Sequence, residues 1–142
     1  MNDRFFLDTN IFVYSFDLGA PQKAGVAREL IQRALQTGKG IVSYQVVQEF
    51  FNVALKRFAR PMSLGDAEQY LAITFRPLLA VYASGPLYGE ALRLRSKYGL
   101  SWYDAIILAS ALEGGCGVLY SEDFQHGRTF GSVRVQNPFV ET

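Results

Sequence analysis

The chain has 142 residues, 49% of them hydrophobic and 19% charged, and a formal net charge of +1. This composition predicts one globular domain over residues 1–142 and excludes a disordered linker protein. No apolar run approaches the ~20 residues of a membrane span, and the N-terminus has no secretion-signal pattern, so we expect a cytoplasmic protein without a membrane partner.

Short apolar runs alternate with helical patterns through the first half of the chain. Apolar residues recur at helical spacing between Pro21 and Thr37, and two glycines follow that stretch. Pro61 ends the next helical pattern. The expected elements of this half are strands over residues 4–8 and 41–43 and helices over residues 11–16, 21–37 and 44–58.

The second half continues the same alternation, and serines mark where its helices begin. Ser63, with Asp66 three residues later, fits a helix capping box, and Ser84 precedes a proline in the same way. The expected elements are helices over residues 63–75, 84–98 and 101–113 and strands over residues 78–82, 117–120 and 133–136. Strands separated by helices predict a three-layer α/β/α domain, in which helices flank a short central parallel sheet.

Four acidic residues lie within or beside apolar runs, although they are far apart in the sequence: Asp8, Glu49, Asp104 and Asp123. An ionised carboxylate in apolar surroundings costs several kcal/mol unless it has a partner. Basic residues near them in sequence do not supply one. Because ligands gather at the carboxyl ends of parallel strands, where Asp8 and Asp123 are expected, a shared divalent cation would stabilise all four. Oxygen ligands favour Mg²⁺ or Mn²⁺.

Each of these residues also has an ordinary structural interpretation. Asp8 could cap the following helix, although Asn10 is closer to that helix and would leave Asp8 free. Asp104 occupies the acidic position of a capping box, a role that is compatible with metal binding. Glu49 could face solvent among polar neighbours, and Asp123 could form a turn. The hypothesis of a metal site therefore depends on the four occurring together.

Four segments in this order carry a resemblance to a known family: residues 6–11 (FLDTNI), 43–50 (SYQVVQEF), 100–105 (LSWYDA) and 119–127 (LYSEDFQHG). The chain resembles the PIN-domain ribonucleases, and most closely the VapC-like toxins of type II toxin–antitoxin pairs. Each segment is weak alone, but the ordered set is specific and spans nearly the whole chain.

The resemblance implies a PIN-like α/β/α fold and an endoribonuclease that uses Mg²⁺ or Mn²⁺ to hydrolyse single-stranded RNA. It also implies a homodimer and a cognate antitoxin protein whose tail covers the groove. The family's site residues transfer to this sequence by position: Asp8, Asp104 and Asp123 as catalytic metal ligands, Glu49 as the acid completing the catalytic pocket, and Asn10 and Ser121 as supporting residues. Ser121 stands where the family often has threonine.

Other functions stay open at this point. A PIN-like module could bind RNA or protein without cutting, although such a module is expected to have lost acidic residues. A housekeeping PIN nuclease would share the site without being a toxin. An aspartyl phosphatase or phospho-acceptor domain also places an aspartate after its first strand, but the phosphatase pattern needs a second aspartate at the position of Asn10.

Overall fold

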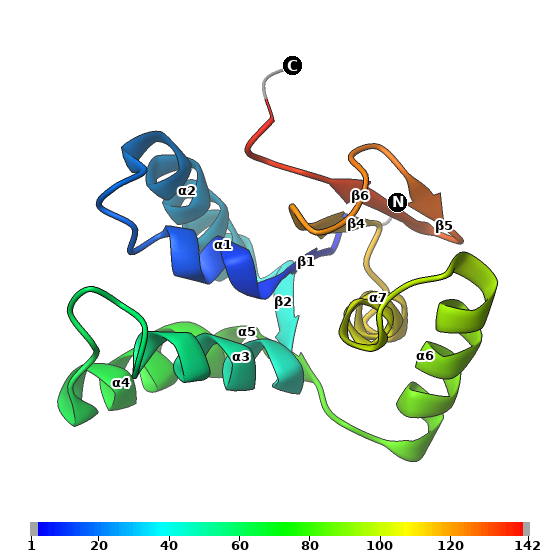
Figure 1. The fold of residues 1–142 in the computed structure, drawn as a ribbon, viewed down its shortest axis with the longest axis horizontal. Coiled ribbons are helices and arrows are strands. Elements are labelled where there is room, and N and C mark those ends of the chain that lie inside the picture. The colour runs from blue at the N-terminus through cyan, green and yellow to red at the C-terminus, as the bar shows by residue number, and fades with distance from the viewer. Residues whose placement is uncertain (1–2, 141–142) are drawn as a thin grey trace.

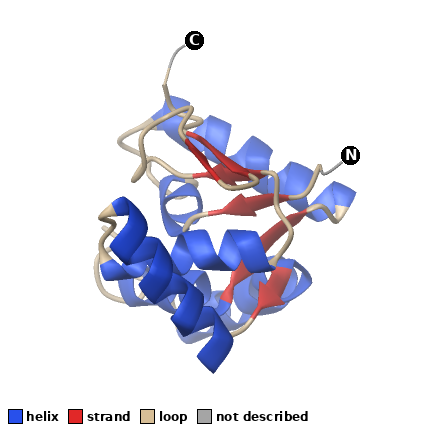
Figure 2. Cartoon of the chain, turned by 90° about the vertical axis from the view of Figure 1, so that its right-hand side faces the viewer, coloured by secondary structure: helices blue, strands red, loops and turns tan. Residues whose placement is uncertain are grey.

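A sheet of six strands, with helices on both faces, forms the centre of the computed structural model, which describes residues 3–140 (Figures 1 and 2). The strands are β1 (Phe5–Leu7), β2 (Gly40–Ser43), β3 (Leu79–Val81), β4 (Val118–Tyr120), β5 (Thr129–Phe130) and β6 (Val133–Gln136). Their order across the sheet is β3-β2-β1-β4-β6-β5, and every neighbouring pair is parallel except β5 with β6. The predicted α/β/α fold is confirmed. The antiparallel strand β5 was not predicted, because two residues are too short to show a periodicity.

Eight helical segments surround the sheet in the described part of the chain. They are α1 (Thr9–Tyr14), α2 (Pro21–Thr37), α3 (Tyr44–Ala54), α4 (Leu64–Tyr70), the π-helix η1 (Leu71–Phe75), α5 (Arg76–Leu78), α6 (Gly85–Tyr98) and α7 (Trp102–Glu113). The capping serines are confirmed: Ser63, Ser84 and Ser101 each accept a hydrogen bond from the backbone N–H three residues later.

Three predicted helices differ in the structure: α1 spans Thr9–Tyr14 where residues 11–16 were expected, and two others differ more. The helix expected over residues 44–58 ends at Ala54, because the chain then turns back and the N–H of Met62 donates to the Ala54 carbonyl over 3.0 Å. The helix expected over residues 63–75 changes from α to π geometry after Tyr70. The latter two differences arise from backbone hydrogen bonding that the spacing of apolar residues does not report.

Strand pairing brings two distant parts of the sequence to one edge of the sheet. β1 is central and pairs in parallel with both β2 and β4, with Leu7 opposite Tyr120. The N–H of Asp8 continues this ladder by donating to the Tyr120 carbonyl over 3.0 Å. The residues that follow β1 and β4 are therefore neighbours in space at the carboxyl edge of the sheet, where parallel folds place their ligands.

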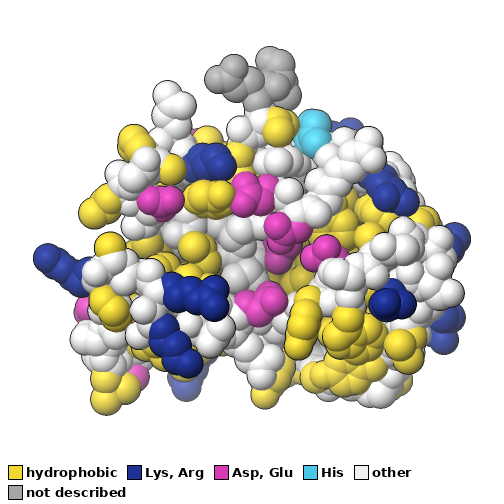
Figure 3. All heavy atoms as spheres, viewed as in Figure 1, with side chains coloured by type: hydrophobic (Ala, Val, Ile, Leu, Met, Phe, Trp, Pro, Cys, Tyr) yellow, Lys and Arg dark blue, Asp and Glu magenta, His cyan; other side chains and the backbone are white. Residues whose placement is uncertain are grey.

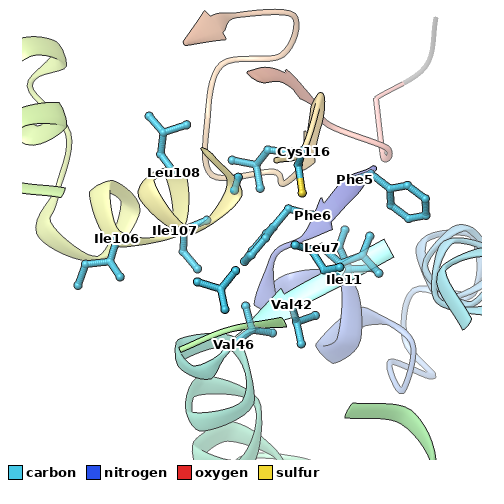
Figure 4. Close-up of a cluster of buried hydrophobic side chains, with 14 of the residues drawn as sticks. Phe5, Phe6, Leu7, Ile11, Val42, Val46, Ile106, Ile107, Leu108 and Cys116 are labelled. Carbon is cyan, nitrogen blue, oxygen red and sulfur yellow. The ribbon is translucent and has the colours of Figure 1, made fainter. Parts of the chain in front are cut away.

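The hydrophobic core joins the sheet to the helices on both faces. Figure 4 shows side chains from β1, β2, α3 and α7 meeting in one cluster, including Phe6 of the central strand and Ile107 of α7. α7 is buried from Ala105 to Ala111, so this helix passes through the interior and leaves only its ends near solvent. Within residues 3–140, no helix combines the length and apolar character needed to cross a membrane.

Candidate functional site

A hollow of about 390 Å³ opens at the carboxyl edge of the sheet, and five acidic residues line it: Asp8, Glu49, Asp104, Glu122 and Asp123. We call it the acidic hollow. Figure 3 shows acidic side chains gathered near the centre of one face of the molecule. The structure therefore brings together all four carboxylates that the sequence singled out, from the ends of β1 and β4 and from α3 and α7.

Asp8 lies at the bottom of the acidic hollow and is only 3% exposed. Its Oδ1 accepts a hydrogen bond from the N–H of Thr9 over 2.7 Å, which makes Asp8 the N-cap of α1. The prediction that Asn10 caps this helix and leaves Asp8 free was wrong. α1 begins at Thr9, directly after the strand, so the residue in the capping position is Asp8, and Asn10 lies inside the first turn.

Ser121 and Asn10 connect the carboxylates to one another. The Ser121 hydroxyl donates to Asp8 Oδ2 over 2.6 Å and accepts from the N–H of Asp123 over 3.0 Å. The Asn10 amide donates to Asp123 Oδ2 over 3.3 Å. These bonds fix the orientation of one buried and one rim carboxylate, and they place both predicted supporting residues within the site.

Glu49 and Asp104 complete the hollow from two helices. Glu49 lies mid-way along α3, and its Oε1 accepts a hydrogen bond from the Thr9 hydroxyl over 2.8 Å. It therefore faces the site and not only solvent. Asp104 lies in the first turn of α7, where its backbone N–H donates to the capping Ser101 hydroxyl over 3.2 Å. The cap positions the first turn of α7, and with it Asp104, at the hollow.

The electrostatics of the acidic hollow oppose ionisation. Burial, together with the charges of Asp123 and Glu49, raises the pKa of Asp8 to about 7, although the hydrogen bonds from Ser121 and Thr9 lower it. Desolvation also raises the pKa of Asp123 at the exposed rim, followed by the charges of Asp104 and other acids of the hollow. Within residues 3–140, none of the four predicted carboxylates lies in an ion pair with a basic side chain.

A comparison with known families shows which family the chain belongs to. A model of the family described as the PIN domain matches residues 5–129. The chain belongs to the PIN domain family. A search of the curated proteins returned no match to this PIN domain.

Several solved structures share the fold of this PIN domain. A toxin–antitoxin complex from Klebsiella pneumoniae is 19% identical, with a TM-score of 0.65 over 94% of this chain and 97% of that one. VapC20 of Mycobacterium tuberculosis, described as a sarcin–ricin loop cleaving toxin, is 20% identical, with a TM-score of 0.61 over 85% and 91%. VapBC2 of Rickettsia felis, bound to a promoter DNA fragment, is 16% identical, with a TM-score of 0.64 over 94% and 97%. At these identities the likeness establishes the fold.

The donor set of this PIN domain suits a hard divalent cation. Its donors are carboxylate oxygens, and the buried Asn10 Oδ1 has no hydrogen-bond partner. In the arrangement of residues 3–140, however, no three acidic, histidine or cysteine side chains are positioned to hold one ion. Asp8, Glu49 and Asp123 instead accept hydrogen bonds from Thr9 and Asn10. The chemistry of the site fits a metal, and binding requires side-chain adjustment.

Two further residues of the acidic hollow, Glu122 and Thr9, were not predicted from the sequence as site residues. Glu122 accepts a hydrogen bond from the Tyr14 hydroxyl over 2.8 Å, and Lys23 Nζ lies 3.7 Å from its other oxygen. Thr9 bonds to both Asp8 and Glu49. The signal for Glu122 and Thr9 was their adjacency to Asp123 and Asp8, but adjacency does not say which way a side chain points.

Proposed function

We propose that this PIN domain is a Mg²⁺- or Mn²⁺-dependent endoribonuclease and the toxin of a toxin–antitoxin pair. The observation that supports it most is the convergence of four carboxylates, from segments up to 115 residues apart, on one hollow with no basic partner within residues 3–140. Concentrated negative charge of this kind destabilises a folded protein unless a cation compensates it.

In this proposal Asp8, Asp104 and Asp123 hold the cation, and Glu49 completes the catalytic pocket beside it. When bound, the cation supplies positive charge that stabilises the phosphate in an in-line displacement and makes a water molecule a better nucleophile. The residues around the ligands hold them in place. Ser121 orients Asp8 and the backbone of Asp123, and Asn10 orients the Asp123 carboxylate.

The toxin role and the RNA substrate rest on the family and on the similar structures. The M. tuberculosis neighbour is described as a toxin that cleaves the sarcin–ricin loop, and the K. pneumoniae neighbour is described as a toxin–antitoxin complex. We therefore extend to this chain an RNA substrate and a cognate antitoxin. A homodimer stays a prediction from the resemblance, to be measured by sedimentation equilibrium of the purified protein.

An RNA cleavage assay with Asp104→Asn tests the proposed activity. Wild type is expected to cleave single-stranded RNA in Mg²⁺ or Mn²⁺ and not in EDTA, and Asp104→Asn is expected to lose at least about 100-fold in rate. The matched control is Asp66→Asn. Asp66 also follows a capping serine by three residues and donates its N–H to that serine, but it lies outside the acidic hollow.

Four results would count against the proposal. Cleavage that survives EDTA would exclude a metal-dependent site, and undiminished cleavage by Asp104→Asn would exclude that carboxylate as a ligand. RNA binding without cleavage in either metal would favour the alternative of a catalytically silent binding module. Equal loss in the Asp66→Asn control would show that the loss of activity is not specific to the acidic hollow.

A further inference from the structure

We propose that a second hollow, next to the acidic hollow, binds one base of the RNA strand beside the phosphate that is cleaved. This inference rests on the proposed function and adds a subsite to it. The hollow encloses about 310 Å³ and shares Gln45 and Tyr103 with the acidic hollow. We call it the aromatic pocket. Its walls come from the start of α3, the residues after β3, and helices α6 and α7.

Aromatic rings and an apolar floor give the aromatic pocket its shape. The rings of Tyr88 and Trp102 stack with their centroids 6.1 Å apart and their planes 30° apart. Leu87 and Ile106 are buried beneath them. Figure 3 shows hydrophobic side chains beside the acidic group on the same face. Flat π surfaces at the mouth of a small cavity are suited to a planar ligand.

Two polar atoms in the aromatic pocket have no partner, and they indicate a ligand with hydrogen-bonding edges. Ser43 is 2% exposed, and its hydroxyl makes no hydrogen bond. It occupies the N-cap position of α3, where a serine hydroxyl ordinarily caps the helix, yet it does not do so. Oε1 of Gln45 is also buried and unpartnered, while its Nε2 donates to the Tyr103 carbonyl over 3.3 Å. Buried groups left in this way cost free energy that a bound ligand would recover.

A nucleobase satisfies both features. Single-stranded nucleic acids bind by stacking unpaired bases on aromatic side chains and by hydrogen bonds to the base edges. An aliphatic side chain of a partner protein would fill the floor but would leave the Ser43 hydroxyl and the Gln45 carbonyl oxygen unpaired. Aspartate, glutamate, lysine and arginine do not line the pocket, so a metal or a phosphate has no charged group to bind there.

The position of Tyr103 connects this pocket to the cleavage chemistry. Tyr103 is 64% exposed and borders both hollows, and the next residue along α7 is Asp104. A strand whose phosphate lies at the carboxylates therefore has a neighbouring base within reach of the aromatic pocket. The pocket would fix the register of the strand, and we expect it to act through substrate binding rather than through the chemical step.

Binding of short single-stranded RNA tests this inference in the cleavage-deficient Asp104→Asn background. Fluorescence anisotropy with a labelled oligonucleotide should show Tyr88→Ala weakening binding by about 5- to 100-fold, with Tyr88→Phe retaining most of the affinity because it keeps the stacking face. Ser43→Ala should weaken binding while leaving the thermal stability unchanged or higher, since its hydroxyl has no partner to lose. The control Ser15→Ala removes a buried hydroxyl outside the pocket and should leave binding unchanged.

An oligonucleotide with one abasic position gives the sharper readout. Moving the abasic position along the strand should identify one site where losing the base weakens binding as much as Tyr88→Ala does. At that site the two losses should not add, because both remove the same contact. Trp102 is the only tryptophan, so its fluorescence should respond to the intact strand and not to the strand abasic at that site. In the cleavage-competent protein, which retains Asp104, Tyr88→Ala should raise the KM for RNA more than it lowers kcat.

The outcomes separate the two proposals. RNA cleavage and binding that do not respond to Tyr88→Ala or Ser43→Ala would overturn the base pocket and leave the nuclease intact. Site-specific coupling between Tyr88 and one base, without cleavage by wild type, would support the pocket and overturn the nuclease. Loss of self-association in these variants without loss of RNA affinity would show that the pocket is a contact between copies of the chain. Failure to bind RNA at all would overturn both proposals.

Discussion

Replacing Asp8 with asparagine is expected to stabilise the metal-free protein while it abolishes cleavage. Burial raises the pKa of this carboxyl from its ordinary 3.8 to about 7. Each pKa unit corresponds to ~1.4 kcal/mol, so holding Asp8 ionised above pH 7 costs on the order of 4 kcal/mol. An amide has the same shape without the charge, although it replaces an acceptor facing Ser121 with a donor, which costs ~1 kcal/mol. The expected net gain is about 3 kcal/mol.

The sign of the pH dependence distinguishes the buried charge of Asp8 from other causes of a difference in stability between Asp8→Asn and wild type. Between about pH 4 and pH 7 the folded wild type binds more protons at Asp8 than the unfolded chain does, so its free energy of unfolding falls as pH rises. Asp8→Asn should therefore be no more stable than wild type near pH 4, and its advantage should reach its maximum above pH 7.

Thermal unfolding in EDTA, followed by circular dichroism from pH 4.5 to pH 8, measures this difference. At pH 8 a gain of about 3 kcal/mol corresponds to a rise in Tm of roughly 6–12 °C for a domain of this size. Added Mg²⁺ should raise the Tm of wild type and leave that of Asp8→Asn nearly unchanged, which narrows the gap. A variant less stable than wild type at pH 8, or a gain that does not change with pH, would refute the reasoning.

Two further substitutions test how the fold positions the site. Gly40→Ala places a methyl group 2.2 Å from the Ala34 side chain and 2.7 Å from the Phe5 side chain. We therefore expect the free energy of unfolding, measured by chemical denaturation, to fall by ~1–3 kcal/mol. Gly25→Ala is the control, because its added carbon contacts nothing. Ser84→Ala removes the cap of α6 and should lower the free energy of unfolding by ~1 kcal/mol without lowering kcat, since α6 does not line the acidic hollow. A fully stable Gly40→Ala would contradict the close packing of α2 on β2.

Much of the candidate site was predictable because acidic residues in apolar runs are physically unusual. Asp8, Glu49, Asp104 and Asp123 could be chosen from the sequence on the cost of desolvation alone, and the parallel fold predicted that Asp8 and Asp123 would meet at one edge of the sheet. The roles of individual side chains were less predictable. Whether Asp8 or Asn10 caps α1 depends on where the helix begins, and a difference of one residue there reverses the assignment.

The sequence by itself determined most of the elements, their order and the capping serines, because hydrophobic periodicity and capping act between residues a few positions apart. Only the tertiary structure decided which side chains meet. The bond from Thr9 to Glu49, the Ser121 hydroxyl between Asp8 and the backbone of Asp123, and the aromatic pocket all join segments distant in sequence. Such contacts depend on strand register and helix packing. These are set by how side chains from the whole core bury together, so no local sequence pattern reports them.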